Sequence, residues 1–135
     1  MFGDSTAGAI DIKVNNVIIE QANSRKYLGM WLDTLLSFSV HIDYAVAVAK
    51  RSAARICNLF DGREGISVQL GIQLYKSLVR PHLEYAAPVW ASANAKDLDK
   101  LDSVQVQCLR RITGAKAHSS SAAIEVITGV LLIKI

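Results

Sequence analysis

Hydrophobic and polar residues alternate near the start of the chain. Apolar side chains occupy every second position over residues 10–14, and they return at residues 17–19 after the pair Asn15-Asn16. Asparagine tolerates the positive φ angles of a two-residue type I′ turn, so this pattern predicts a β-hairpin. A further strand is expected from Tyr27 to Leu32. The first part of the chain is therefore expected to form a small antiparallel sheet with an open edge.

From Val40 the spacing of the apolar residues becomes that of an amphipathic helix. Arg51 and Arg55 lie on its opposite, outward face. The glycines within residues 61–65 permit a left-handed cap and are expected to end the helix. The side chains predicted to share its buried face are Ile42, Val46, Ala49, Ala53, Ile56 and Phe60.

A second helix is predicted to follow the N-cap residue Ser67. Because it is apolar over much of its circumference, we expect it to be central to the core. Pro81 lacks a backbone donor, which predicts a kink or break within residues 77–80. One apolar stripe comprises Val68, Ile72, Tyr75, Val79, Leu83 and Ala86, and another comprises Leu70, Leu74 and Leu78.

A third helix is predicted between the cap residue Asn94 and Gly114, and a short last helix from Ala122 to Thr128 after a run of serines. The apolar residues that follow Gly129 are expected to be available for pairing at a strand edge. The buried stripe predicted for the third helix comprises Leu98, Leu101, Gln105, Cys108, Leu109 and Ile112. The predicted fold class is α+β, with a small antiparallel β-meander followed by a mostly α-helical bundle.

Composition limits the class of protein. Of the 135 residues, 51% are hydrophobic and 20% are charged, which is typical of a globular domain rather than a disordered chain. The mean hydropathy of +0.26 indicates a domain that packs against more protein. No uninterrupted apolar run reaches the ~18 residues of a membrane helix. Cys57 and Cys108 lie far apart with no CxxC motif, so we expect reduced thiols in an intracellular protein of the cytoplasm or nucleus.

Basic residues form two candidate nucleic-acid-binding sets, although the net charge is only +3. Arg51 and Arg55 are spaced i, i+4, which weakens an isolated helix and suggests an anionic partner. The second set lies on the outward face of the third helix and comprises Lys96, Lys100, Arg110 and Arg111. For any single member, the alternative is an ordinary solvated helix face.

Candidate catalytic and metal-binding residues are not evident. Asp97, Asp99 and Asp102 are close in sequence, but they lie near the start of a helix, where carboxylates compensate the helix dipole. No Ser/His/Asp set, phosphate-binding glycine loop or cluster with metal-ligand spacing is present, so an independent enzyme is not expected. We therefore predict no catalytic and no metal-binding residue in this chain.

Four segments in one order resemble a known family: residues 26–33, residues 75–90, residues 98–114 and residues 122–129. The second of these reads YKSLVRPHLEYAAPVW. Together they are similar to the downstream part of a non-LTR (LINE-like, jockey-like) retrotransposon reverse transcriptase, from the end of the palm through the thumb. The resemblance implies that residues 1–36 are the end of the palm and residues 37–135 a helical thumb-like region.

The resemblance also implies how the segments act. Tyr27, Leu28 and Gly29 match a primer-grip motif that steadies the primer 3′ end; the alternative is an ordinary strand with Gly29 at a bulge. The helices would hold an RNA/DNA template–primer duplex. The parent enzyme would use Mg²⁺ bound by paired aspartates of the palm. No adjacent aspartates occur here, so the chain is expected to be an inactive fragment lacking the parent's palm and fingers.

Two other interpretations remain open. The chain is a translated remnant without a function of its own, or it is a helical scaffold for protein interactions. Poor solubility of the isolated chain would favour the remnant, whereas salt-sensitive binding of nucleic acid would favour the polymerase fragment.

Overall fold

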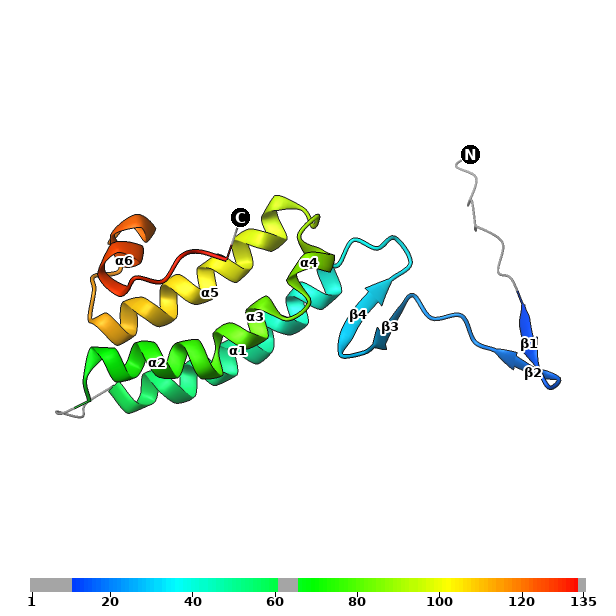
Figure 1. The fold of residues 1–135 in the computed structure, drawn as a ribbon. Helices are drawn as coiled ribbons and strands as arrows, with labels where there is room; N and C mark the ends of the chain where they lie inside the picture. The colour runs from blue at the N-terminus through cyan, green and yellow to red at the C-terminus, as the bar shows by residue number, and fades with distance from the viewer. Residues whose placement is uncertain (1–10, 61–65, 134–135) are drawn as a thin grey trace.

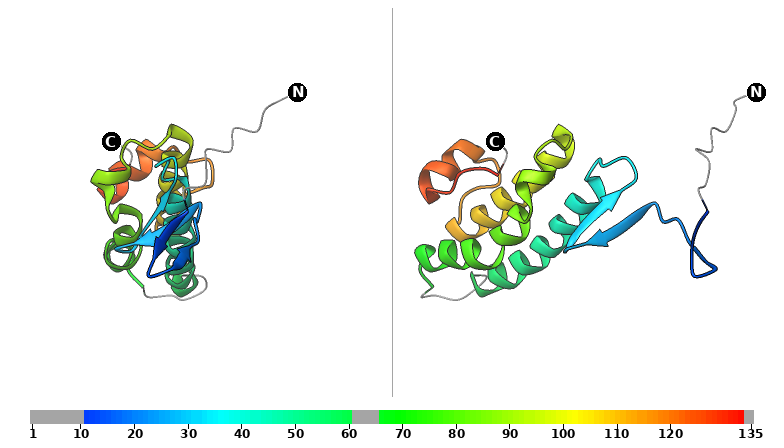
Figure 2. Two further views of the ribbon diagram at one scale, coloured as in Figure 1. Left: turned by 90° about the vertical axis from the view of Figure 1, so that its right-hand side faces the viewer. Right: turned by 45° about the vertical axis from the view of Figure 1, so that its right-hand side comes forward.

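A computed structural model describes residues 11–60 and 66–133. It confirms the predicted α+β class, with antiparallel strand pairs followed by a mostly helical region (Figure 1). The expected strand start at residue 10, the glycine-rich end of the first helix at residues 61–65 and the last two residues lie outside the described part. In Figure 1 and in the right view of Figure 2 the long helices lie side by side, and the first hairpin extends away from them.

The first hairpin forms as predicted. Strands β1 (Ile12–Val14) and β2 (Val17–Ile19) pair antiparallel, with Ile12 opposite Ile19 and Val14 opposite Val17. Asn15 and Asn16 have φ angles of 49° and 65°, as a type I′ turn requires. All residues of the two strands are exposed to solvent. An isolated two-stranded hairpin is marginally stable in water, so its apolar face needs further protein to cover it.

The prediction of a single strand from Tyr27 to Leu32 is wrong. The structure has two strands there, β3 (Ser24–Tyr27) and β4 (Met30–Asp33), paired antiparallel across the turn Leu28-Gly29. Both turn residues have positive φ, 49° at Leu28 and 83° at Gly29, so Gly29 lies in a turn and not at a bulge. The two hairpins form separate two-stranded sheets rather than one continuous meander.

Helix α1 (Ser39–Phe60) carries the predicted buried stripe. Five of the six predicted core residues are buried, and Phe60 packs half-buried against the core. The loop before the helix is held by Asp33, whose Oδ1 accepts hydrogen bonds from the backbone N–H of Leu35 (3.0 Å) and Ser37 (2.9 Å). These bonds fix the angle at which α1 leaves the β3–β4 hairpin.

The second predicted helix is interrupted near Pro81, as expected. Helix α2 (Val68–Leu78) starts at the N-cap Ser67 and ends before Val79; the short helices α3 (Arg80–Glu84) and α4 (Ala87–Trp90) follow. The expectation that this helix is central to the core is only partly met. Its Tyr75 side is buried, but Leu70 and Leu78 are exposed because no described element covers that side.

Helix α5 (Ala95–Thr113) begins and ends where predicted. The Asn94 side chain accepts a hydrogen bond from Asp97 N, and Gly114 ends the helix in the left-handed conformation. The helix runs parallel to α1: Ser39 Oγ donates to Asp97 Oδ2 (2.6 Å) near the start of both helices, and Cys57 neighbours Cys108 near their ends. The core is formed mainly by side chains of α1, α2, α3 and α5, and Phe38, Trp90, Ile124, Val130 and Ile133 complete it.

Helix α6 (Ser121–Thr128) is capped by Ser120, and Gly129 ends it. The segment after Gly129 does not offer a free edge, so that expectation is wrong for residues 130–133. Val130 and Ile133 are buried, and side chains of α5 and α6 bind the backbone between them. Glu125 Oε1 accepts from Leu132 N, and Asp102 Oδ1 accepts from Ile133 N.

Candidate nucleic-acid interface

The turn between β3 and β4 lies against Tyr85, at the end of α3. Tyr85 Oη donates a hydrogen bond of 2.6 Å to the Leu28 carbonyl oxygen. A Cβ atom at Gly29 would lie 3.1 Å from Tyr85 Oη, and φ there is +83°, so glycine suits the position on both grounds. Residues 26–33 and 75–90, which carry the family resemblance in the sequence, therefore meet in the structure.

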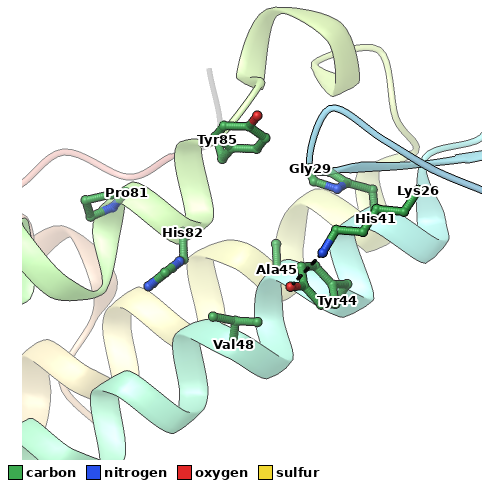
Figure 3. Close-up of a pocket in the computed structure, with 9 residues that line it drawn as sticks. All are labelled: Lys26, Gly29, His41, Tyr44, Ala45, Val48, Pro81, His82 and Tyr85. Atoms are coloured by element: carbon green, nitrogen blue, oxygen red, sulfur yellow. Dashed lines mark hydrogen bonds between the residues drawn. The ribbon is translucent and has the colours of Figure 1, made fainter.

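A pocket of about 390 Å³ lies beneath this contact, between the β3–β4 hairpin, α1 and α3 (Figure 3). Its floor is apolar, and its rim carries aromatic, imidazole and amino groups from three elements. The residues that line it are Lys26, Gly29, His41, Tyr44, Ala45, Val48, Pro81, His82 and Tyr85. Polar groups around an apolar floor are typical of a binding site.

Tyr44 is held in place on the pocket rim by two neighbours. Lys26 Nζ donates to Tyr44 Oη (3.3 Å) and lies 4.8 Å from the centroid of the Tyr44 ring. The Trp31 and Tyr44 ring centroids are 6.3 Å apart at an interplanar angle of 59°. Such tilted aromatic contacts and cation–π contacts orient the ring.

His41 links strand β4 of the second hairpin to helix α1. Its Nδ1 accepts a hydrogen bond from Trp31 N (3.4 Å), and the side chain is buried. Burial lowers the pKa of His41, and a backbone contact with Tyr85 opposes this in part. The imidazole is therefore neutral at pH 7, with its proton on Nε2, because Nδ1 acts as the acceptor.

The buried histidine predicts that stability falls in mild acid. The unfolded state takes up a proton near pH 6.5 that the folded state resists, so lowering the pH from 7.5 to 5.5 should reduce the free energy of unfolding. Asp33 and Asp97, whose pKa values are lowered from 3.8, act only at more acidic pH. Urea unfolding at the two pH values measures the change.

The matched variants are His41→Asn and His118→Asn. The first should remove most of the pH dependence between pH 7.5 and 5.5, which corresponds to uptake of up to about one proton on unfolding. The second changes an exposed histidine and should leave the dependence unchanged. Equal pH dependence in the wild type and His41→Asn would contradict the assignment.

The pocket continues along α1 into the first predicted basic set. Tyr44, Val48, Arg51 and Arg55 follow one another at i, i+4, i+7 and i+11, which places them on one stripe of the helix. Both arginines are exposed, and Arg51 Nε donates only a long hydrogen bond (3.4 Å) to the Ala47 carbonyl of its own helix. This stripe thus joins aromatic, apolar and cationic side chains.

The second basic set is not gathered into one surface. Lys100 Nζ lies 2.6 Å from Asp43 Oδ1 and 2.7 Å from Asp97 Oδ1, and these hydrogen bonds raise the pKa of Lys100 to about 12. The Arg110 guanidinium donates to the Ser119 carbonyl and so holds the loop before α6. Lys96 and Arg111 are exposed on α5.

Lys50 was missed by the sequence analysis. It lines a small groove of about 140 Å³ between α1 and α5, together with Gln107 and Arg111. The signal was its position beside the buried stripe of α1, but the parallel packing that brings it near Arg111 cannot be read from the sequence. Lys26, Tyr44 and Tyr85 were also not singled out, although all three line the larger pocket.

Two acidic side chains of α5, those of Asp97 and Asp102, bind groups of other segments and so stabilise the fold. Asp97 is buried and accepts hydrogen bonds from Ser39, Asn94 and Lys100; those from Lys100 and Ser39 are the largest causes of its lowered pKa.

Within residues 11–60 and 66–133, no three histidine, cysteine or carboxylate side chains come together as a metal site. In the same residues, no helix has the length and apolar character needed to cross a membrane.

Relatives of the chain are polymerases of mobile elements. It is 32% identical, over 92% of its length, to the RNA-directed DNA polymerase from mobile element jockey of Drosophila melanogaster. It is 29% identical over 84% of its length to the jockey polymerase of Drosophila funebris. The identity to the probable RNA-directed DNA polymerase from transposon X-element of Drosophila melanogaster is 27% over 78%.

The homologues are thus jockey-like and other non-LTR transposon polymerases, which confirms the resemblance. The chain spans only 14%, 12% and 12% of the length of the jockey polymerase of Drosophila melanogaster, the X-element polymerase and the jockey polymerase of Drosophila funebris, respectively. No protein-family model matches the chain, and no solved structure matches it significantly.

Proposed function

We propose that this chain, as a homologue of one segment of these polymerases, holds the template–primer duplex for an active site formed elsewhere in a larger enzyme. One observation carries the proposal. The Tyr27-Leu28-Gly29 turn is hydrogen-bonded to Tyr85 and lies at one end of a helix stripe that continues into Arg51 and Arg55. A turn that lies next to a cationic helix face can contact successive positions of a nucleic-acid backbone.

Each part has a distinct proposed role. Tyr27 and Leu28 are exposed at the turn, with 64% and 77% of their surface accessible, and would contact the primer end. Arg51 and Arg55 would bind backbone phosphates, because phosphate contacts position a duplex without reading its sequence. Lys96 and Arg111 on α5 would supply further phosphate contacts. Lys100 and Arg110 bind acceptors within the chain and would help to keep α5 in place.

Residues 11–60 and 66–133 offer no donor set for the metal ions that nucleotide transfer requires. Two-metal polymerase chemistry needs clustered carboxylates, and the described residues hold no group of three metal-binding side chains. We therefore assign no catalytic step to these residues. The palm and fingers of a larger polymerase are the proposed protein partners. The exposed apolar side chains of β1 and β2 support this, since such a face is stable only when covered.

Duplex binding should depend on salt through the α1 arginines. In the Arg51→Ala/Arg55→Ala double variant, we expect the slope of log affinity against log salt to fall by about 1 for each lost phosphate contact. The measurement is fluorescence anisotropy of a labelled RNA/DNA template–primer duplex over a salt series, with the full chain.

The control is a Lys13→Ala/Lys116→Ala double variant, which removes the same net charge at exposed positions outside the stripe. It should keep the wild-type slope. Affinity that does not change with salt would rule out phosphate binding altogether. An equal loss in both double variants would show a general charge effect and refute the assignment to Arg51 and Arg55.

A further inference from the structure

We propose that the pocket between the β3–β4 hairpin, α1 and α3 receives one unpaired nucleotide from the bound nucleic acid. The inference rests on the proposed function, because it assumes that nucleic acid binds along α1. It assigns a ligand class to the pocket, whereas the proposed function concerns the duplex phosphates and the contact of Tyr27 and Leu28 with the primer end. The size, the walls and the charges of the pocket each support it.

The size and the walls suit a base. A volume of about 390 Å³ falls within the range of small-molecule sites. Tyr44 and Tyr85 lie on different elements at its rim, and aromatic rings are the usual stacking partners of unpaired bases. Ala45 and Val48 form an apolar floor whose side chains have no hydrogen-bond donor or acceptor, so a flat aromatic ring can replace water there.

The charges suit a phosphate outside the base. Lys26 Nζ spends one of its three donors on Tyr44 Oη, so two remain for an anionic oxygen at the rim. Arg51 lies about two helical turns beyond Tyr44 on the same stripe, so a second cation is available there for another phosphate of the strand. A purely apolar ligand, such as a hydrophobic side chain of a protein, would use the floor and leave the two remaining donors of Lys26 Nζ unused.

The test compares two duplexes with the same paired sequence. One is blunt, and the other carries a single unpaired 2-aminopurine nucleotide at the primer 3′ end. We expect the full chain to bind the second about 5- to 150-fold more tightly, the range that corresponds to about 1–3 kcal/mol for one stacked base. The 2-aminopurine fluorescence should be quenched on binding. Equal affinity without quenching would overturn the inference.

Matched variants locate the effect. Val48→Phe fills the floor and should abolish both the preference for the unpaired nucleotide and the quenching. Val126→Phe makes the same change at a position of α6 that is 85% exposed, and it should leave the preference intact. If Val48→Phe does not fold, as judged by circular dichroism, Lys26→Ala replaces it, with Lys13→Ala as its control. A preference that survives the pocket variant overturns the inference.

The outcomes separate the two proposals. Tight binding of both duplexes with equal affinity keeps the proposed function and refutes the nucleotide pocket. Absence of binding to either duplex refutes the proposed function. In that case 2-aminopurine riboside 5′-monophosphate alone tests the pocket: quenching that Val48→Phe removes supports a nucleotide site, and no quenching rejects it.

Discussion

Replacing Gln105 with leucine should destabilise the protein by about 1–3 kcal/mol for each polar group left unpaired. Gln105 is completely buried on α5. Its Oε1 accepts from Tyr75 Oη (2.7 Å), and its Nε2 donates to the Leu131 carbonyl (2.8 Å). The variant removes the acceptor of a buried hydroxyl whose pKa is raised by burial. It also leaves the Leu131 carbonyl only a long bond (3.4 Å) from Arg80.

Urea unfolding of the variant measures the loss, and Gln107→Leu is the matched control. Gln107 is exposed on the same helix, so that change should stay within about 0.5 kcal/mol. Adding Tyr75→Phe to Gln105→Leu should recover part of the loss, because removing both partners leaves no unpaired hydroxyl. Equal stability of the two glutamine variants would show that the network does not stabilise the fold.

Gly71→Ala should also destabilise, although alanine is normally favoured over glycine in a helix by about 1 kcal/mol. A Cβ atom at Gly71 would lie 2.4 Å from Phe60 Cζ and 2.5 Å from Ile112 Cγ2. The Phe60 ring end has some freedom, but Ile112 Cγ2 is attached directly to a Cβ atom of α5. Overpacking of a tight core costs about 1–3 kcal/mol, so the net change should be a loss of stability.

The control for Gly71→Ala is Gln73→Ala, an exposed position on the same helix. It should have little effect on the urea midpoint. In the double variant Gly71→Ala/Phe60→Leu, the destabilisation should be smaller than the sum of the single effects, since leucine removes the atoms nearest the new methyl group. Stabilisation by Gly71→Ala alone would show that α2 can move away from α5 without cost.

The elements that the sequence predicted correctly are those set by local signals. Asn15 and Asn16 adopt the positive φ angles of their turn with no help from the rest of the protein. Ser67 and Asn94 cap their helices through hydrogen bonds that span three residues. The apolar stripes of α1 and α5 were found because their period is long and regular.

The β3–β4 turn could not be predicted in the same way. Leucine rarely adopts a positive φ angle, yet Leu28 does so here. It also lies within a run of strand-forming residues that predicts one continuous strand. The turn is stabilised by Tyr85, 57 residues further along the chain. Tertiary contact therefore overrides the local preference, and it also creates the pocket that the sequence did not reveal.

The candidate site was partly predictable. The shared position of Arg51 and Arg55 follows from helical spacing alone, and the structure leaves both exposed. Capture of Lys100 by Asp43 depends on how α1 packs beside α5, which the spacing does not encode. Capture of Arg110 depends on the path of a loop, where the backbone carbonyl of Ser119 gives no sequence signal.

The parallel packing of α1 and α5 has a consequence for how the chain folds. The contacts that join their first turns, Ser39 with Asp97 and Asp43 with Lys100, close loops of 58 and 57 residues. Loop closure of this length has an entropic cost that must be met before the contact stabilises anything. We therefore expect α1 and α2, which are neighbours in the chain, to associate early. Docking of α5 would then complete the core late, so a nascent chain would expose the inner face of α1 until residue 113 has been synthesised.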